Sequence, residues 1–318
     1  MAIALARSRT VRRGIAGIGD VLFSRSTLVF ALIVVGILLG AIVILSIDAW
    51  PSVTRFGPSF VWSTAWDVVR QQFGALPAIF GTLLSSFLAL IIAVPVSLGA
   101  AIFLAELSPR WLGTPASFLI ELLAAIPSVI IGLWGLFVLV PAMRPVETGL
   151  QAAFGFLPIF QGPRFGVGFL SAGVILAIMI IPIITALSRD ALRAVPDAQR
   201  EAMLALGATR WETISRAVLA YCRSGLVGAV ILGLGRALGE TMAVTMVIGN
   251  AYRLTASLFS PGSTIASKIA NEFSEASSSL EIGALVELAL ILFAVTVVVN
   301  VIARLLVWRL TAVRTVRE

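Results

Sequence analysis

Long apolar runs, almost free of charged residues, limit most strongly what this chain can fold into. Residues 28–47 form twenty consecutive positions without a charge, enough for a helix to cross the ~30 Å hydrocarbon core of a bilayer. Composition agrees, because only 12% of the residues are charged, whereas soluble domains contain about 25%. We therefore predict an all-α integral membrane protein with six transmembrane helices. The predicted spans are Leu28–Ile47, Ile79–Ala105, Leu122–Val140, Gly166–Ser188, Ser224–Tyr252 and Ile282–Ala303.

The distribution of basic residues predicts the orientation of these spans. With the N-terminus inside, the inner segments contain sixteen arginines and the three outer loops contain six basic residues. Because positive charge is enriched in cytoplasmic loops, we place both termini in the cytoplasm and the protein in the cell (inner) membrane. The chain then divides into a basic cytoplasmic segment (1–27), a retained first anchor helix (28–47) and a membrane core (79–308) that includes a cytoplasmic loop at 189–223.

Several chemistries are excluded by residues that the chain lacks. It has no histidine and one cysteine, Cys222, so zinc sites, histidine-ligated haem and internal disulfides are excluded. The sole lysine, Lys268, follows Ala266-Ser267, so no Walker A loop exists. We expect no catalytic residue, metal or cofactor, and any ATP hydrolysis must occur on another chain. The net charge of +7 is dispersed between apolar spans, which favours contact with anionic membrane lipid over nucleic acid.

Two charges lie in the middle of the predicted fifth span. Arg236 and Glu240 have twelve uncharged residues on each side, and each charge at such a depth costs roughly 2.5–3.5 kcal/mol. A spacing of four places both on one helix face, where they can bond to each other. One interpretation is an ion pair that fixes helix packing. The other, which we favour, is that the pair faces a translocation path, since arginine can bind two oxygens of a phosphate-like anion. Glu287 is a second candidate for the path, or lies in a protein-lined outer cavity.

Helix signals in the 189–223 loop predict two short helices joined by a glycine turn. Pro196 and Asp197 suit a first helical turn, and Gly207 is placed to end that helix. Thr209 and Glu212 then form a capping box that begins a second helix running toward Tyr221. The loop is therefore expected to be a rigid protrusion.

The residues of this loop resemble a known family. Glu201-Ala202-Met203-x3-Gly207 is similar to the E-A-A-x3-G signature of binding-protein-dependent ABC importer permeases, with departures at Met203, Ala217 and Ala220. The segments Gly233–Asn250 and Ile269–Ala276 resemble more specifically the PstC-type permeases of phosphate importers. The resemblance extends over roughly residues 25–310.

This resemblance implies the type I ABC importer permease (MetI-like) fold. It implies partners too: a second permease subunit, two ATP-binding subunits and an extracytoplasmic phosphate-binding protein, with phosphate as the transported ion. Glu201, Ala202 and Gly207 would then couple the chain to the ATPase, and Arg236, Glu240 and Glu287 would line the path. Two alternatives stay open: a permease for another oxyanion such as sulfate or molybdate, and an ATP-independent anion carrier or channel.

Overall fold

The computed structural model describes the backbone of residues 2–312, and over that range the regular structure is helical apart from two isolated bridges. The α-helices are α1 (Ala2–Asp48), α2 (Trp50–Phe56), α3 (Ser59–Trp62), α4 (Leu76–Ile102), α5 (Arg110–Ala124), α6 (Ser128–Trp134), α7 (Val140–Phe154), α8 (Phe169–Arg193), α9 (Asp197–Ala205), α10 (Arg210–Glu212), α11 (Leu219–Tyr221), α12 (Arg223–Leu238), α13 (Met242–Ile248), α14 (Ile265–Glu272) and α15 (Ser279–Ala312). Three π-helical segments, η1 (Phe103–Leu107), η2 (Gly135–Leu139) and η4 (Thr213–Val218), and a 3-10 turn, η3 (Pro158–Phe160), lie between them.

Within the described residues, five helical stretches are long and apolar enough to cross a membrane. A sixth is obtained if the bent pair Arg210–Tyr221 and Arg223–Leu238, which meet at 70°, counts as one span. The all-α membrane fold predicted from the sequence is therefore confirmed. The five stretches are Gly19–Asp48, Leu76–Leu107, Ser128–Phe154, Phe169–Arg193 and Ser279–Leu305.

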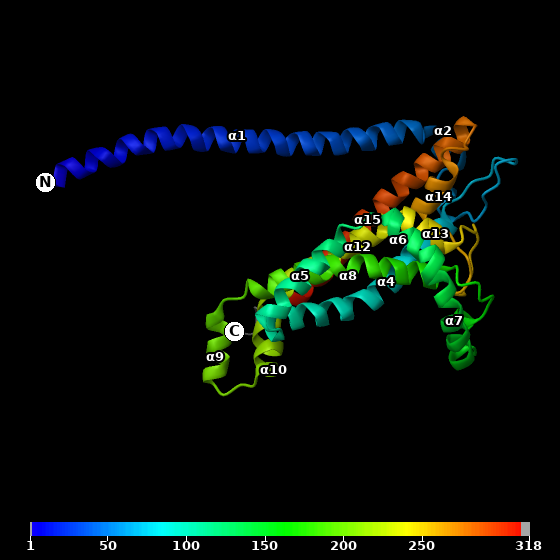
Figure 1. Ribbon diagram of the computed structural model, residues 1–318. Helices are drawn as coiled ribbons and strands as arrows, with labels where there is room; N and C mark the ends of the chain where they lie inside the picture. Colours follow the sequence, from blue (N-terminus) through cyan, green and yellow to red (C-terminus); the bar gives the residue numbers. More distant parts are fainter. Residues whose placement is uncertain (1, 313–318) are drawn as a thin grey trace.

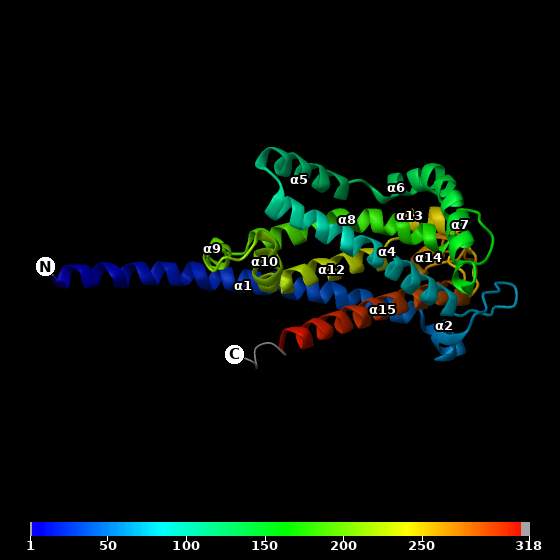
Figure 2. The ribbon, with the colours of Figure 1, turned by 90° about the horizontal axis from the view of Figure 1, so that it is seen from below.

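Helices α4 and α8 form the centre of the bundle, side by side in both views (Figures 1 and 2). Small residues let their backbones approach closely: a Cβ on Gly173 of α8 would lie 2.7 Å from the Cβ of Leu88 on α4. Helix α12 packs on α8 in the same way, since a Cβ on Gly233 would meet the side chain of Ile184 at 2.6 Å. Pro95 and Pro182 remain inside α4 and α8.

Helix α1 lies apart from the bundle over most of its length (Figure 1). It meets the other helices near its C-terminal end, where α2 and α15 pack against it. None of its most apolar eighteen-residue window is buried within the chain. Because a fully apolar surface is not stable in water, this part of α1 must face lipid or another chain.

The predicted third span, Leu122–Val140, is wrong in its position. Helix α5 ends at Ala124 and α6 begins at Ser128, with Pro127 between them in an extended conformation (φ −57°, ψ 136°). Proline disfavours helical conformation in the preceding residue and cannot donate a hydrogen bond, which is consistent with the break at this position. The span-length helical stretch instead runs from Ser128 to Phe154 and includes residues that were expected to form an outer loop.

The predicted fifth span, Ser224–Tyr252, is also not one helix. Helix α12 ends at Leu238, Gly239 follows it as the C-cap, and α13 begins only at Met242. The chain then turns at Gly249, whose φ is +85°, and pairs with Gly262 through an isolated bridge. Gly249 suits this turn because it has no Cβ to clash in the left-handed conformation.

Candidate translocation and coupling sites

The break between α12 and α13 contains the two charges singled out in the sequence. Arg236 lies in the last turn of α12, Glu240 lies in the break, and Nη2 of the arginine is 3.2 Å from Oε2 of the glutamate. The predicted pairing is therefore confirmed. The two side chains differ in exposure, with 47% of Arg236 accessible and 3% of Glu240. The buried carboxylate thus holds a guanidinium that stays open to its surroundings.

Glu240 also stabilises the helix that follows the break. Its Oε1 accepts a hydrogen bond from the backbone N–H of Ala243 at 3.3 Å, in the first turn of α13. The first backbone N–H groups of a helix have no partner within the helix, so a carboxylate there satisfies one of them. One carboxylate therefore orients Arg236 and caps α13. This second role was not predictable from an unbroken fifth span, because in a continuous helix the Ala243 N–H would already have a partner.

Arg236 has donors that the chain does not use. A guanidinium has five N–H donors, and in the described part of the chain Arg236 pairs only with Glu240. The remaining edge presents positive charge and several donors in a fixed plane. That arrangement can bind a carboxylate or a phosphate-like oxyanion through two hydrogen bonds.

Glu287 lies elsewhere, on α15, and is 8% exposed. One turn earlier, at Gly283, α15 packs so closely on the start of α2 that an added Cβ would lie 3.5 Å from the backbone nitrogen of Ser52. Oε2 of Glu287 has no hydrogen-bond partner in the described structure, and no described arginine or lysine forms an ion pair with it. The structure therefore brings Arg236 and Glu240 together without linking Glu287 to them.

The loop after α8 has the local structure that the sequence predicts. Helix α9 begins at Asp197, and the chain reverses at Gly207, whose φ is +81°. The predicted capping box is present: the Thr209 hydroxyl accepts from the Glu212 backbone N–H, and the Glu212 carboxylate accepts from the Thr209 backbone N–H. The α9–α10 protrusion forms one end of the bundle, opposite the end where α2 and α14 lie (Figure 1).

The tip of this protrusion is open to its surroundings. Glu201, Ala202 and Gly207 are all exposed. Two large apolar side chains are exposed beside them, Leu206 at 84% and Trp211 at 68%. Sequence reasoning missed these two residues, although apolar residues at the end of a predicted charged loop were a visible signal. Exposed apolar and aromatic side chains beside a charged residue are typical of a protein interface.

Lys268 lies in a cage formed by Trp66, Tyr252 and Glu272, which was not predicted from the sequence. It is 7% exposed, pairs with the Glu272 carboxylate, and its Nζ lies 4.5 Å and 4.4 Å from the ring centroids of Trp66 and Tyr252. Burial lowers the pKa of Lys268, whereas the hydrogen bond to Glu272 raises it. The cage ties α14 to the segment before α4, at the end of the bundle opposite the protrusion.

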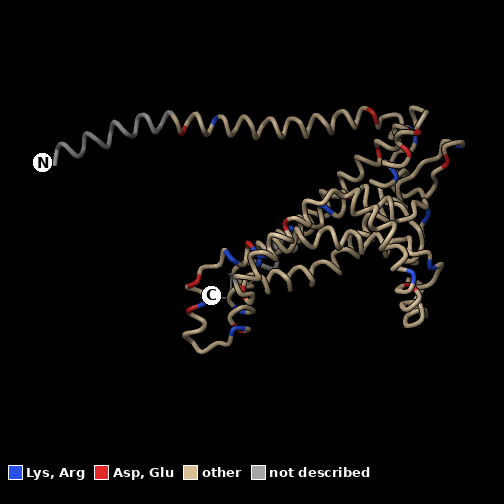
Figure 3. Tube along the Cα trace, viewed as in Figure 1, with Lys and Arg blue, Asp and Glu red and all other residues tan. Residues whose placement is uncertain are grey.

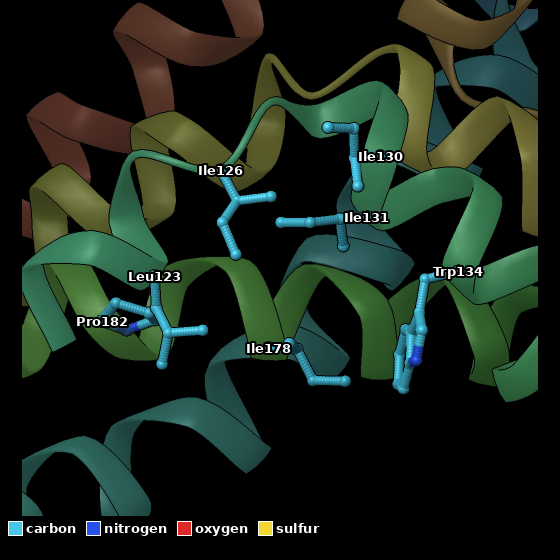
Figure 4. Close-up of a pocket in the computed structure, with 7 residues that line it drawn as sticks. All are labelled: Leu123, Ile126, Ile130, Ile131, Trp134, Ile178 and Pro182. Carbon is cyan, nitrogen blue, oxygen red and sulfur yellow. The ribbon is translucent and has the colours of Figure 1, made fainter. Parts of the chain in front are cut away.

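A separate apolar cavity of about 350 Å³ lies between α5, α6 and α8 (Figure 4). It borders the break at Pro127, and its walls contain no charged side chain. An anion would lose its hydration there without gaining a partner, so this cavity is not an anion site. Its lining residues are Leu123, Ile126, Ile130, Ile131, Trp134, Ile178 and Pro182.

Residues 94–312 match the family described as "Binding-protein-dependent transport system inner membrane component". This chain belongs to that family. It is therefore a multi-pass membrane protein of the ABC transporter permease class. All six residues predicted for the path and for coupling lie in the matched region.

Close relatives of this permease carry a more specific name. The chain is 51% identical over 296 residues to the "Phosphate transport system permease protein PstC" of Pasteurella multocida, and the match covers 92% of each chain. It is 45% identical over 316 residues to the PstC protein of Mesorhizobium japonicum, covering 98% of this chain and 96% of that one.

A solved structure supports the fold of the permease. A chain of the MetNI methionine ABC transporter, in an inward-facing conformation, aligns with a TM-score of 0.52 at 18% identity. The alignment covers 76% of this chain and 95% of the other. The expected MetI-like permease fold is thus confirmed.

Proposed function

We propose that the protein is the permease subunit of an ATP-driven importer of inorganic phosphate. The observation that carries the proposal is the similarity to phosphate transport permeases over more than nine-tenths of both chains. In this proposal the chain forms half of a translocation path with a second permease subunit. An extracytoplasmic binding protein delivers phosphate, and two ATP-binding subunits drive the cycle.

In this proposal Arg236 is the anion-binding group of the path. The guanidinium of Arg236 is exposed and is held in place by the buried Glu240 carboxylate, so it can bind an oxyanion transiently. Transmembrane helices that are interrupted near the middle of the bilayer recur in transporters, because the interruption exposes polar groups that can bind a substrate. The break after α12 leaves Arg236 in the last turn of that helix with its guanidinium accessible. Glu287 is a further path candidate whose buried carboxylate has an unpaired oxygen.

The proposed orientation places the α9–α10 protrusion and both termini in the cytoplasm. The excess of arginine in the segments on that side of the membrane supports it. The blue residues near α9 and α10 in Figure 3 belong to this group. Glu201, Ala202 and Gly207 at the exposed tip then contact the ATPase. Because the chain has no Walker A loop, hydrolysis occurs on that partner.

Substrate competition tests the proposal directly. The permease is expressed with the proposed second permease, ATP-binding and phosphate-binding subunits in a strain that lacks its own phosphate importer, and uptake of labelled phosphate is measured. We expect ATP-dependent uptake that excess sulfate or molybdate does not inhibit. Inhibition by sulfate would favour a permease for other oxyanions. Uptake without any ATP-binding subunit would favour an ATP-independent carrier instead.

A further inference from the structure

An ion pair joins the α9 protrusion to the membrane bundle. Arg200 on α9 forms a two-point contact with Glu106, which lies on the π-helical segment η1 at the end of α4. The distances are 2.7 Å from Nη2 to Oε1 and 3.3 Å from Nε to Oε2. Both side chains are largely buried, with 20% of Arg200 and 10% of Glu106 exposed. Arg200 immediately precedes the exposed Glu201. One turn of α9 therefore contains a residue that contacts the bundle and a residue that is open to the surroundings.

The same guanidinium also binds the end of α8. Nη1 donates to the carbonyl oxygen of Val195 at 2.6 Å, and Nη2 donates to that of Leu192 at 3.0 Å. One acceptor, Leu192, lies in the last turn of α8, and the other, Val195, lies two residues after that helix ends. A fifth contact, from Nη1 to Asp197, completes its donor set. Arg200 therefore fixes α4, α8 and α9 to one another at a single point.

Helix α9 packs against η4, but it has no buried core of its own. None of its residues is buried, so apolar packing contributes little to its position. A cavity of about 220 Å³ lies beside the ion pair, lined in part by Leu204, Arg210 and Thr213. Two π-helical segments, η1 and η4, border this cavity, and such segments recur at functional sites. The hydrogen bond to Glu106 raises the pKa of Arg200, so the guanidinium stays charged.

We propose that the Arg200–Glu106 pair is the link that transmits movement of α9 to helices α4 and α8 of the bundle. Arg200 and Glu106 are positioning residues in this scheme and contact neither ATP nor the transported ion. The inference rests on the proposed function, since it takes α9 as the element that an ATPase moves. If the link is broken, α9 can follow the ATPase while the bundle does not, so hydrolysis continues without transport.

The experiment uses the complete importer in proteoliposomes and measures ATP hydrolysis and phosphate uptake in the same sample. In Glu106→Gln and Arg200→Gln we expect the ratio of phosphate transported to ATP hydrolysed to fall about tenfold, within the usual range of coupling between sites. The double variant should be no worse than either single variant, because the two residues act as one unit. ATP hydrolysis itself should remain near its original rate.

Asp197→Asn is the matched control. Asp197 binds the same guanidinium at 3.2 Å but lies on α9 itself and is 88% exposed, so it makes no link to α4. This variant should keep the original ratio of transport to hydrolysis. An unchanged ratio in Glu106→Gln and Arg200→Gln would overturn the inference. Loss of the ATP-binding subunit from Glu106→Gln and from the milder Arg200→Lys would overturn it too, because the pair would then only maintain the shape of the loop.

A second readout separates this inference from the proposed function. Leu232 on α12 is 60% exposed, and Leu232→Cys in a Cys222→Ala background can be labelled with a thiol reagent. Addition of ATP should change its labelling rate in the coupled importer and should not do so when Glu106→Gln is added. Failure of the unaltered importer to take up phosphate, with this ATP response intact, would refute only the phosphate function. An ATP response that survives Glu106→Gln would refute the link.

Discussion

An arginine–glutamate pair lies at each end of the α9–α13 region, Arg200–Glu106 in the protrusion and Arg236–Glu240 at the helix break, and the two arginines differ in exposure and in the number of their partners. At the break, Arg236 keeps 47% of its side chain exposed and makes one ion pair. In the protrusion, Arg200 is 20% exposed, and its five donors meet acceptors on Glu106, Asp197, Leu192 and Val195. An arginine whose donors are all occupied has nothing left for a ligand. It therefore acts as a tether, whereas Arg236 retains the capacity to bind an ion that comes and goes.

The carboxylates differ in the same sense. Glu240 is almost fully buried. It bonds to the backbone N–H of Ala243 just after the helix break, and it fixes the orientation of Arg236. Glu106 lies on a different helix from Arg200, so its pairing links two elements that are distant in sequence. Glu240 joins only the adjacent segments α12 and α13, so it holds a binding group in place and does not link elements distant in sequence. This difference predicts which variants abolish transport and which ones uncouple it.

The largest effect is expected from Arg236→Gln. Removing the guanidinium takes away the anion ligand and leaves the Glu240 carboxylate buried without a partner, a change that costs roughly 2–5 kcal/mol or more in comparable pairs. Phosphate uptake should fall at least about thirtyfold, which corresponds to ~2 kcal/mol. The ATP-binding subunit should still co-purify, because the loop is untouched. Arg70→Gln, at a side chain 77% exposed, is the control and should transport normally. Normal uptake by Arg236→Gln would show that the pair serves packing alone.

Glu240 variants separate its two roles at the break. Glu240→Gln keeps an oxygen that can accept from Ala243 but loses the charge that holds Arg236, and Glu240→Ala loses both. We expect uptake to fall in both variants. Thermal stability of the purified complex should fall more in Glu240→Ala, by the ~1 kcal/mol typical of a lost helix cap. Equal stability of the two variants would argue that the carboxylate does not cap α13.

Much of this fold follows from apolar run length and local helix signals. The number of spans and the loop with its glycine reversal and capping box were predictable, because run length and capping depend on neighbouring residues. The breaks at Pro127 and Gly239 were not. Pro95 and Pro182 stay inside helices while Pro127 ends one, so proline alone does not decide between a kink and a break. In the folded chain α6, which follows Pro127, packs against α13, a contact that the local sequence does not reveal.

The candidate site shows the same division. The Arg236–Glu240 pairing was predictable because four-residue spacing brings side chains together on a helix. The Arg200–Glu106 pair was not, because its residues lie 94 positions apart and no sequence period relates them. The cage around Lys268 was missed for the same reason, since Trp66 and Tyr252 come from separate segments. Neither pairing could be found without the tertiary structure.

At the tip of the protrusion, Leu206→Asp should weaken attachment of the ATP-binding subunit. Leu206 is 84% exposed within the chain, so its replacement has little effect on folding. A buried apolar contact at an interface is commonly worth ~1–2 kcal/mol, so co-purification at limiting concentration should fall roughly fivefold to thirtyfold. Val69→Asp is the matched control, since Val69 is 94% exposed at the opposite end of the molecule. Equal retention of the ATP-binding subunit in both variants would place the ATPase contact elsewhere.

The smallest effect is expected from Gly207→Ala, which tests backbone conformation alone. A Cβ at Gly207 would meet no atom within 4 Å, so the penalty comes only from its φ of +81° and should be ~1–2 kcal/mol. This strain should loosen the reversal between α9 and α10 and modestly reduce transport, while Arg200 still links α9 to α4. Gly235→Ala is the matched control, because it too has open space for a Cβ but lies inside α12 with helical geometry. It should be neutral or slightly stabilising in a thermal melt, since alanine favours the helix. If Gly207→Ala and Gly235→Ala melt and transport alike, the positive φ at the tip contributes nothing to coupling.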